Sequence, residues 1–342
     1  MLFFFQETGM SETVTIYDVA RAAGVSPATV SRVMNEPSKV AQEKRQRVLD
    51  CIRELHFVPK ADAVINARKA YKKIGVVAPF FTQTSFLERL RGIATVLTPE
   101  HYELVMYSID SNEDLENYIS TLITANRVDG LIFLCVHLDS RMLSLLSRSR
   151  FPVCFVEDPV DGFDSVIVRN LEGGQKAAEH LYSKGCRRPC FIGEKSNLPY
   201  AVRASEDRFQ GFKFYFANQG ILIDEKYVWM GEFTEQKLDE GIFGILSQNP
   251  LPDGVFCSSD LIAARFVALA REKGIRIGTD IKVLGFDDID IASYIGLSSV
   301  SQNLDESGRA AAQLILSPME HKANAVTNIM LPLTVIERQT TN

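Results

Sequence analysis

The apolar positions in most of this chain form short continuous runs separated by longer amphipathic stretches. Continuous apolar runs are typical of strands buried on both faces of a sheet. They predict strands at Ile74–Pro79, Tyr102–Ser108, Gly130–Val136, Pro152–Glu157, Ser165–Val168, Pro189–Gly193, Gly254–Ser258 and Lys282–Phe286. The predicted helices between them include Leu87–Leu97, Leu171–Lys184, Arg208–Gln219 and Leu261–Lys273. This alternation indicates an α/β fold of parallel sheets covered by helices, arranged as two lobes with a ligand cleft beyond the carboxyl ends of the strands.

The start of the chain has a helical period instead. An apolar stripe at helical spacing consists of Ile16, Val19, Ala20 and Ala23. Thr15 with Asp18 is a helix-start pattern, and Gly24 ends the helix because glycine adopts the left-handed conformation at little cost. Ser26 followed by Pro27 then predicts a second helix that begins almost at once.

A third amphipathic stretch at about Gln42–Leu55 completes a small helical domain, and the tight turn between its first two helices predicts a helix-turn-helix. In the second helix Val30 and Val33 turn inward while Arg32 faces outward, where it can bond guanine in the major groove. The other residues expected to contact bases or phosphates are Thr15, Tyr17, Ser26, Pro27, Ala28, Thr29, Ser31 and Asn35. A helical hairpin without a role in DNA binding is the alternative.

The charge distribution supports the DNA-binding interpretation. The 342 residues carry a net charge of -6, but the chain through Lys73 has 12 Lys and Arg against 8 Asp and Glu, a net +4, which leaves -10 for the remainder. A basic head on an acidic body is typical of a nucleic-acid-binding module attached to a different domain.

The sequence gives no sign of a membrane span or of secretion. No apolar run reaches the ~18 residues of a spanning helix, and Met1–Gly9 lacks a basic leader and a cleavage site. We interpret residues 1–12 as a disordered extension, with Met10 as an alternative start, and expect a cytoplasmic protein.

Enzyme and metal chemistry are not indicated either. The chain contains no dinucleotide fingerprint, phosphate loop or nucleophile elbow, and its histidines form no ligand pair. We therefore expect no catalytic residues, no cofactor and no metal. The six cysteines are expected to be free thiols, and those in apolar runs to behave as small hydrophobic residues: Cys135, Cys154, Cys190 and Cys257.

The run from Thr15 to Asn35, TIYDVARAAGVSPATVSRVMN, closely resembles the DNA-binding signature of the lactose/galactose-repressor (LacI/GalR) family, and the resemblance continues to about residue 340. It implies that Pro27, Ala28 and Arg32 read bases. It also implies a type I periplasmic-binding-protein-like core whose chain crosses between the lobes three times. The partners it implies are operator DNA with an inverted repeat, a sugar or sugar-derivative effector, and a second copy of the chain in a homodimer, with a tetramer left open.

The resemblance divides the chain into a helix-turn-helix domain at 13–57, a hinge at 58–72 and a core at 73–342, with lobe 1 at about 73–171 and 300–328 and lobe 2 at about 172–299 and 329–342. In the family a hinge leucine wedges into the minor groove, but here that position holds Asn66, and Asp62 replaces a usual apolar residue. Ile65 or Val64 is a substitute wedge. We expect weaker DNA bending than is usual in the family, and a linker without DNA contacts is the alternative.

The resemblance also implies a set of effector-binding residues. Arg208 and Asp287 match positions that bind ligand hydroxyls or carboxylates, and Glu157 stands where aspartate is common. Arg169 replaces a usual aspartate, so either it faces the cleft with Arg208 and favours an anionic effector, or it pairs with Glu157. The other expected wall residues are Ser85, Phe86, Phe233, Ser259 and Leu304. The alternatives are that Asp287 caps a helix, Arg208 lies on the surface and the aromatic residues belong to the core.

The sequence thus predicts a transcription repressor that is not an enzyme. Effector binding closes the cleft, changes the spacing of two DNA-binding heads and so alters operator affinity. A periplasmic solute-binding protein with the same core, and an enzyme on an α/β scaffold, are the competing interpretations.

Overall fold

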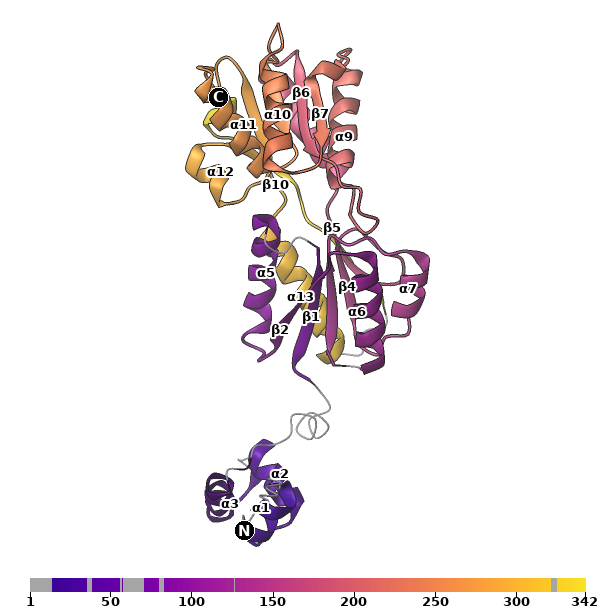
Figure 1. The fold of residues 1–342 in the computed structure, drawn as a ribbon, viewed down its shortest axis with the longest axis vertical. Helices are drawn as coiled ribbons and strands as arrows, with labels where there is room; N and C mark the ends of the chain where they lie inside the picture. Colours follow the sequence, from indigo (N-terminus) through magenta and orange to yellow (C-terminus); the bar gives the residue numbers. More distant parts are fainter. Residues whose placement is uncertain are drawn as a thin grey trace, which may run out of the picture. The chain divides into compact units, whose positions relative to one another are not determined.

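The computed structural model describes residues 14–35, 39–55, 57, 71–79, 83–125, 127–320 and 325–342. They belong to two units, Met1–Tyr71 and Lys72–Asn342 (Figure 1). The expected extension at 1–12 and most of the expected hinge, Asn66, Ile65 and Asp62 included, lie outside the described residues. No helix in the described part of the chain combines the length and the apolar character needed to cross a membrane.

The first unit contains the three predicted helices, α1 (Ile16–Ala23), α2 (Pro27–Asn35) and α3 (Gln42–Glu54). Gly24 ends α1 with a φ of 64°, and the Val25 N–H donates to the Ala20 carbonyl at 3.0 Å, which closes the helix end as predicted. The three helices enclose an apolar cluster that contains Val19, Ala20, Ala23, Val30, Val33, Val48 and Phe57. This small core fixes the side of α2 that stays exposed.

The first lobe of the second unit is a parallel sheet with helices on both faces. Across the sheet the strands are β11 (Asn328–Met330), β5 (Asp164–Ile167), β4 (Val153–Glu157), β3 (Gly130–Leu134), β1 (Lys73–Ala78) and β2 (Glu103–Ser108). One face packs against α5 (Thr84–Leu97) and α13 (Leu304–Glu320), and the other against α6 (Asn112–Ala125) and α7 (Ser140–Leu146). Because both faces are covered, the central strands consist of buried residues throughout.

The second lobe has the same architecture. Across its sheet the strands are β12 (Thr334–Ile336), β10 (Ser298–Ser301), β9 (Lys282–Asp287), β8 (Gly254–Cys257), β6 (Pro189–Glu194) and β7 (Val228–Gly231), and only β12 is antiparallel to its neighbour. One face packs against α8 (Asn170–Ser183) and α9 (Ala204–Asn218), and the other against α10 (Glu235–Leu246), α11 (Asp260–Glu272) and α12 (Asp290–Ile295). Two short 3-10 segments, Glu225–Tyr227 and Gln339–Thr341, complete the lobe.

The chain passes between the lobes three times, as predicted: between β5 and α8, between β10 and α13, and between β11 and β12. In Figure 1, α13 follows the second-lobe strand β10 in sequence but lies beside α5 in the first lobe. Since β10 belongs to the second sheet and β11 to the first, the last two crossings fall a few residues later than expected. The strand order β5-β4-β3-β1-β2 in one sheet corresponds to β10-β9-β8-β6-β7 in the other, a structural repeat that the sequence does not display.

Most of the sheet could be predicted from apolar runs, and the exceptions are its shortest strands. All predicted strands are present, with ends shifted by one or two residues. Strands β7, β10, β11 and β12, which have only three or four residues each, were not predicted from the sequence. Strand β10 (SSVS) is mostly serine, so no apolar run marks it although its first three residues are buried.

Candidate effector-binding and DNA-binding sites

The two lobes line a common cavity of about 110 Å³. Three strand ends supply carboxylates to it: Glu157 ends β4, Glu194 ends β6 and Asp287 ends β9. The carboxyl ends of parallel strands are where ligands bind in folds of this class. Of the residues expected to bind an effector, the cavity brings together Ser85, Phe86, Glu157, Arg208, Phe233, Ser259 and Asp287.

A buried arginine from the first lobe, Arg89 on α5, organises one side of the cavity. Its Nη2 lies 3.1 Å from Glu157 Oε2 and 3.0 Å from Gln302 Oε1. Its Nη1 lies 3.1 Å from the Sγ of Cys135, and that thiol donates to Glu157 Oε2 at 2.8 Å. Arg89 and Glu157 thus form a hydrogen-bonded ion pair in which both side chains are almost fully buried.

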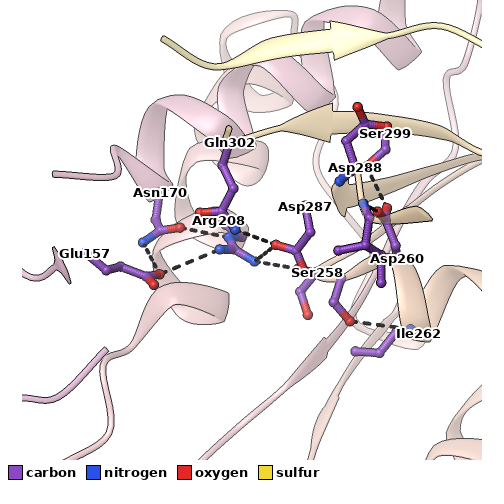
Figure 2. Close-up of polar contacts among 12 residues, drawn as sticks. Glu157, Asn170, Arg208, Ser258, Asp260, Ile262, Asp287, Asp288, Ser299 and Gln302 are labelled. Carbon is purple, nitrogen blue, oxygen red and sulfur yellow. Dashed lines mark hydrogen bonds and ion pairs between the residues drawn. The ribbon is translucent and has the colours of Figure 1, made fainter. Parts of the chain in front are cut away.

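Arg208 on α9 organises the second side and joins the two lobes (Figure 2). Its Nε donates to Asn170 Oδ1 at 2.8 Å, its Nη1 donates to the Ser258 carbonyl at 2.6 Å, and its Nη2 lies 3.7 Å from Glu157 Oε1. The guanidinium also stacks 3.7 Å from the ring centre of Phe286. The alternative that Arg208 is a surface residue is therefore wrong.

Asp287 accepts a hydrogen bond from Gln302 Nε2 and lies 4.0 Å from Arg208 Nη1 (Figure 2). It does not cap the next helix: α12 has Ile289 as its N-cap residue and no side-chain cap. The neighbouring Asp288 pairs with Arg338 at 2.8 Å instead. The capping alternative is therefore wrong for both aspartates.

Strained backbone marks the same strand ends. Glu157 has a φ of 87° and Asp287 a φ of 109°, and Cys135, just after β3, has a φ of 54°. Residues other than glycine adopt positive φ at a cost of about 1–3 kcal/mol, and such residues concentrate at binding sites. The strain supports a binding role for this cavity rather than a purely structural one.

The pKa values of the Glu157 and Asp287 carboxyl groups are shifted in opposite directions. Burial by itself raises the pKa of Glu157, but Arg89 and Arg208 outweigh it and hold that pKa below its ordinary value. Burial raises the pKa of Asp287 to about 6, because Arg208 and Arg89 oppose it only in part. Burial, together with the charge of Asp287, also raises the pKa of Asp260, which accepts from the Ile289 N–H at 2.9 Å and the Ser299 hydroxyl at 2.6 Å.

Two expected residues lie outside the cavity. Arg169 has a largely exposed side chain whose Nη1 pairs with Glu172 at 3.2 Å, so it neither faces the cleft nor pairs with Glu157. The anionic effector proposed on the basis of Arg169 therefore loses its support. Leu304 is buried at the start of α13 and lines a separate acidic hollow.

Two other expected residues have a structural role beside their place in the cavity wall. Phe86 also packs in the apolar core of the first lobe. The Ser259 side chain caps α11 by accepting from the Ile262 N–H at 3.4 Å.

The sequence analysis missed several cavity residues. Arg89 lies in an amphipathic helix, where a charged residue is usually solvated, and nothing in its spacing marks it as buried. Cys135 packs against the apolar core of the first lobe, as expected of a small hydrophobic residue, but its thiol also bonds Glu157 and faces the cavity. Glu194 directly follows the predicted strand Pro189–Gly193, so the strand-end rule that led to Glu157 would have found it. Gln302, which lines the cavity, and Asn170, which accepts from Arg208 without lining it, had no signal in the sequence.

The exposed side of α2 forms a separate candidate site. Ala28 and Arg32 are exposed, and Ser26 Oγ caps the helix by accepting from the Thr29 N–H at 3.2 Å. No ion pair joins Arg32 to another described residue. Of the other expected DNA contacts, Thr15 and Tyr17 are exposed, whereas Pro27, Thr29 and Ser31 are half-buried. The side chain of Asn35 is not among those described.

Comparison with known proteins assigns both units to known families. Residues 15–60 match the family of bacterial regulatory proteins of the lacI type, and residues 178–341 match the periplasmic binding protein-like domain. Catabolite control protein A of Staphylococcus epidermidis is 30% identical over 96% of this chain and 99% of its own. The HTH-type transcriptional repressor PurR of Erwinia tasmaniensis is 29% identical over 95% of this chain and 96% of its own.

A solved structure extends the similarity to the complete fold. The transcriptional regulator CelR in complex with cellobiose has 25% sequence identity and a TM-score of 0.68, with 96% of this chain and 99% of that chain covered.

Proposed function

The chain belongs to the LacI family of bacterial regulatory proteins, and from this premise we propose that it is a repressor controlled by a sugar or sugar-derivative effector. Helix α2 reads the operator, and the cavity between the two lobes binds the effector. The observation that supports operator reading by α2 is the exposed Arg32, on a capped helix with the family's signature. An arginine at this position can make a bidentate bond to guanine.

The cavity supports a polyhydroxylated effector. Its carboxylates, arginines and serine hydroxyls are the groups that bond sugar hydroxyls, and the exposed ring of Phe233 offers a face for stacking. The relative CelR, with the same fold, has been solved with cellobiose. Binding across both lobes gives the effector a means to hold them in one arrangement.

DNA binding requires two copies of the chain. A two-fold dimer presents two α2 helices to half-sites about one helical turn apart, so the operator is an inverted repeat. The protein binds this operator in the cytoplasm. At the hinge, Asn66 and Asp62 replace apolar residues, and the DNA is therefore bent less sharply than an apolar wedge would bend it, unless Ile65 takes that place.

Selection of bound duplexes from a random DNA library tests the proposal and requires no assumed operator sequence. The native protein should enrich an inverted repeat. Arg32→Ala should lose preference for one base pair in each half-site. The dimer should bind ~30-fold to ~10⁴-fold more weakly, because each of the two lost contacts supplies ~1–3 kcal/mol of base discrimination.

The matched control is Arg53→Ala, which removes the same charge from an exposed position on α3. It should leave the enriched sequence unchanged. An Arg32→Ala protein that enriches the native sequence with native affinity would contradict the proposal.

A further inference from the structure

The charged lining of the cavity is unbalanced. Two arginines, Arg89 and Arg208, face four carboxylates, which are Glu157, Glu194, Glu206 and Asp287. Both guanidinium groups are already engaged by protein atoms: Arg89 by Glu157, Gln302, Cys135 and Ser307, and Arg208 by Asn170, the Ser258 carbonyl and the ring of Phe286. An anionic ligand would therefore add negative charge where the positive groups are already neutralised.

Glu194 is a carboxylate of the lining with no direct partner. No hydrogen bond or ion pair joins its side chain to another described residue, although it is half-buried. Burial raises its pKa; Arg208 opposes this increase, whereas Asp287, Glu157 and Glu206 add to it. A half-buried carboxylate surrounded mainly by other carboxylates is unfavourable unless a cation comes close to it.

Two buried hydroxyls beside the acidic residues also lack partners. The Oγ atoms of Ser205 and Ser258 have no hydrogen bond within the described structure, although the residues are only 6% and 2% exposed. Both residues line the cavity. Ser205 adjoins the end of β6, because a Cβ atom built on Gly193 would lie 2.7 Å from its Oγ. Buried hydroxyls without partners are unfavourable, so these two point to a ligand that supplies donors and acceptors.

We propose that the effector carries a primary ammonium group next to hydroxyl groups, as an amino sugar does, with the ammonium bound by Glu194 and Glu206 and the hydroxyls by Ser205 and Ser258. This inference deepens the proposed function and rests on it. An ammonium has three donors and one positive charge, which match two carboxylates and reduce the imbalance of the lining. A neutral sugar would occupy the same space but leave Glu194 without a counter-charge.

Titration calorimetry with matched sugars tests the inference. The probes are D-glucosamine, D-galactosamine and D-mannosamine, each compared with its parent sugar and its N-acetyl derivative. At least one amino sugar should bind at least tenfold more tightly than both neutral counterparts. Its affinity should fall as the pH is lowered and Glu194 gains a proton, because burial and the neighbouring carboxylates raise the pKa of that group. Arg208, Asp287, Glu157 and Glu206 are the charged groups that face it.

Glu194→Gln is the diagnostic variant and Glu179→Gln, an exposed position on α8 of the same lobe, is its control. Glu194→Gln should weaken amino-sugar binding at least tenfold, whereas Glu179→Gln should bind like the native protein. Both should unfold at the native midpoint or above it.

Three outcomes would overturn the inference: no amino sugar binds, the neutral sugars bind equally well, or Glu194→Gln keeps native affinity. Binding of neutral sugars alone would still leave an effector-controlled repressor. Failure of that function would appear instead in the selection of DNA sequences.

Discussion

Glu157 and Asp287 occupy equivalent places at the ends of β4 and β9, yet their surroundings shift their pKa values in opposite directions. Glu157 has Arg89 in direct contact and Arg208 at 3.7 Å, so it remains ionised. Asp287 lies 4.0 Å from Arg208 and accepts its hydrogen bond from the neutral amide of Gln302. The repeat of the fold therefore does not extend to the electrostatics of the site.

Asp287→Asn tests this difference through the pH dependence of stability. The folded protein keeps a proton on Asp287 up to about pH 6, whereas an unfolded chain releases it near 3.8. The folded state thus binds more protons in that window, and the contribution of Asp287 to stability is present below pH 4 and is lost as pH rises to about 6.

Asp287→Asn should remove the loss of stability that accompanies deprotonation of Asp287. Two pKa units correspond to ~3 kcal/mol, so the decrease in unfolding free energy between pH 4 and pH 7 should be smaller in Asp287→Asn by about that amount. Denaturant unfolding at several pH values measures it. Parallel pH profiles for variant and native protein would show that Asp287 titrates normally.

Replacement of Arg89 should lower the free energy of unfolding strongly. Arg89→Met leaves Glu157 and its neighbours without their main counter-charge in a buried site and should cost ~3–5 kcal/mol of unfolding free energy. Arg91→Met, on the exposed side of the same helix, should cost less than ~1 kcal/mol. Combining Arg89→Met with Glu157→Gln should restore at least half of the loss, and a double variant less stable than the single one would contradict the pairing.

At the level of elements, glycines set the closest helix contacts and thereby place the two arginines. A Cβ atom on Gly92 of α5 would lie 2.0 Å from the Asp305 carbonyl of α13, and one on Gly308 would lie 2.0 Å from the Arg89 carbonyl. In the second lobe a Cβ atom on Gly174 of α8 would lie 1.8 Å from the Arg208 carbonyl. Each lobe thus holds its cavity arginine at a close crossing of two helices.

Gly92→Ala should separate α5 from α13 and cost ~1–3 kcal/mol, since backbone must move to admit the methyl group. Gly244→Ala is the control: Gly244 is exposed in the last turn of α10 with open space around it, and the variant should stabilise the protein by ~0.5–1 kcal/mol. Denaturant midpoints of the two variants should therefore move in opposite directions. A Gly92→Ala protein as stable as Gly244→Ala would mean that the crossing is not tight.

These helix crossings belong to the part of the fold that could not be predicted from the sequence. The pattern of apolar runs predicted the α/β class, the two lobes and most strands, because burial on both faces leaves a direct trace in the sequence. The role of Gly174 in a helix crossing could not be predicted, because such a crossing depends on a partner helix far away in the chain. The burial of Arg89 could not be predicted for the same reason, because its partners Glu157 and Gln302 are distant in sequence.

At the scale of the whole molecule, the proposed function requires the cavity and the head to be coupled. Arg208 on α9 already reaches Glu157 of the other lobe, so a ligand that competes for these groups alters the contacts that join the lobes. In a dimer, a change of lobe arrangement alters the separation of two heads. Coupling of this kind is reciprocal and typically amounts to ~1–3 kcal/mol.

The most direct test is therefore a pair of titrations with the selected operator and an amino sugar that binds the native protein. Operator affinity is measured with and without saturating sugar, and sugar affinity with and without saturating operator. The account predicts that both affinities change by the same factor, about 5–150-fold. A sugar that binds in the cavity while operator affinity stays constant would contradict it.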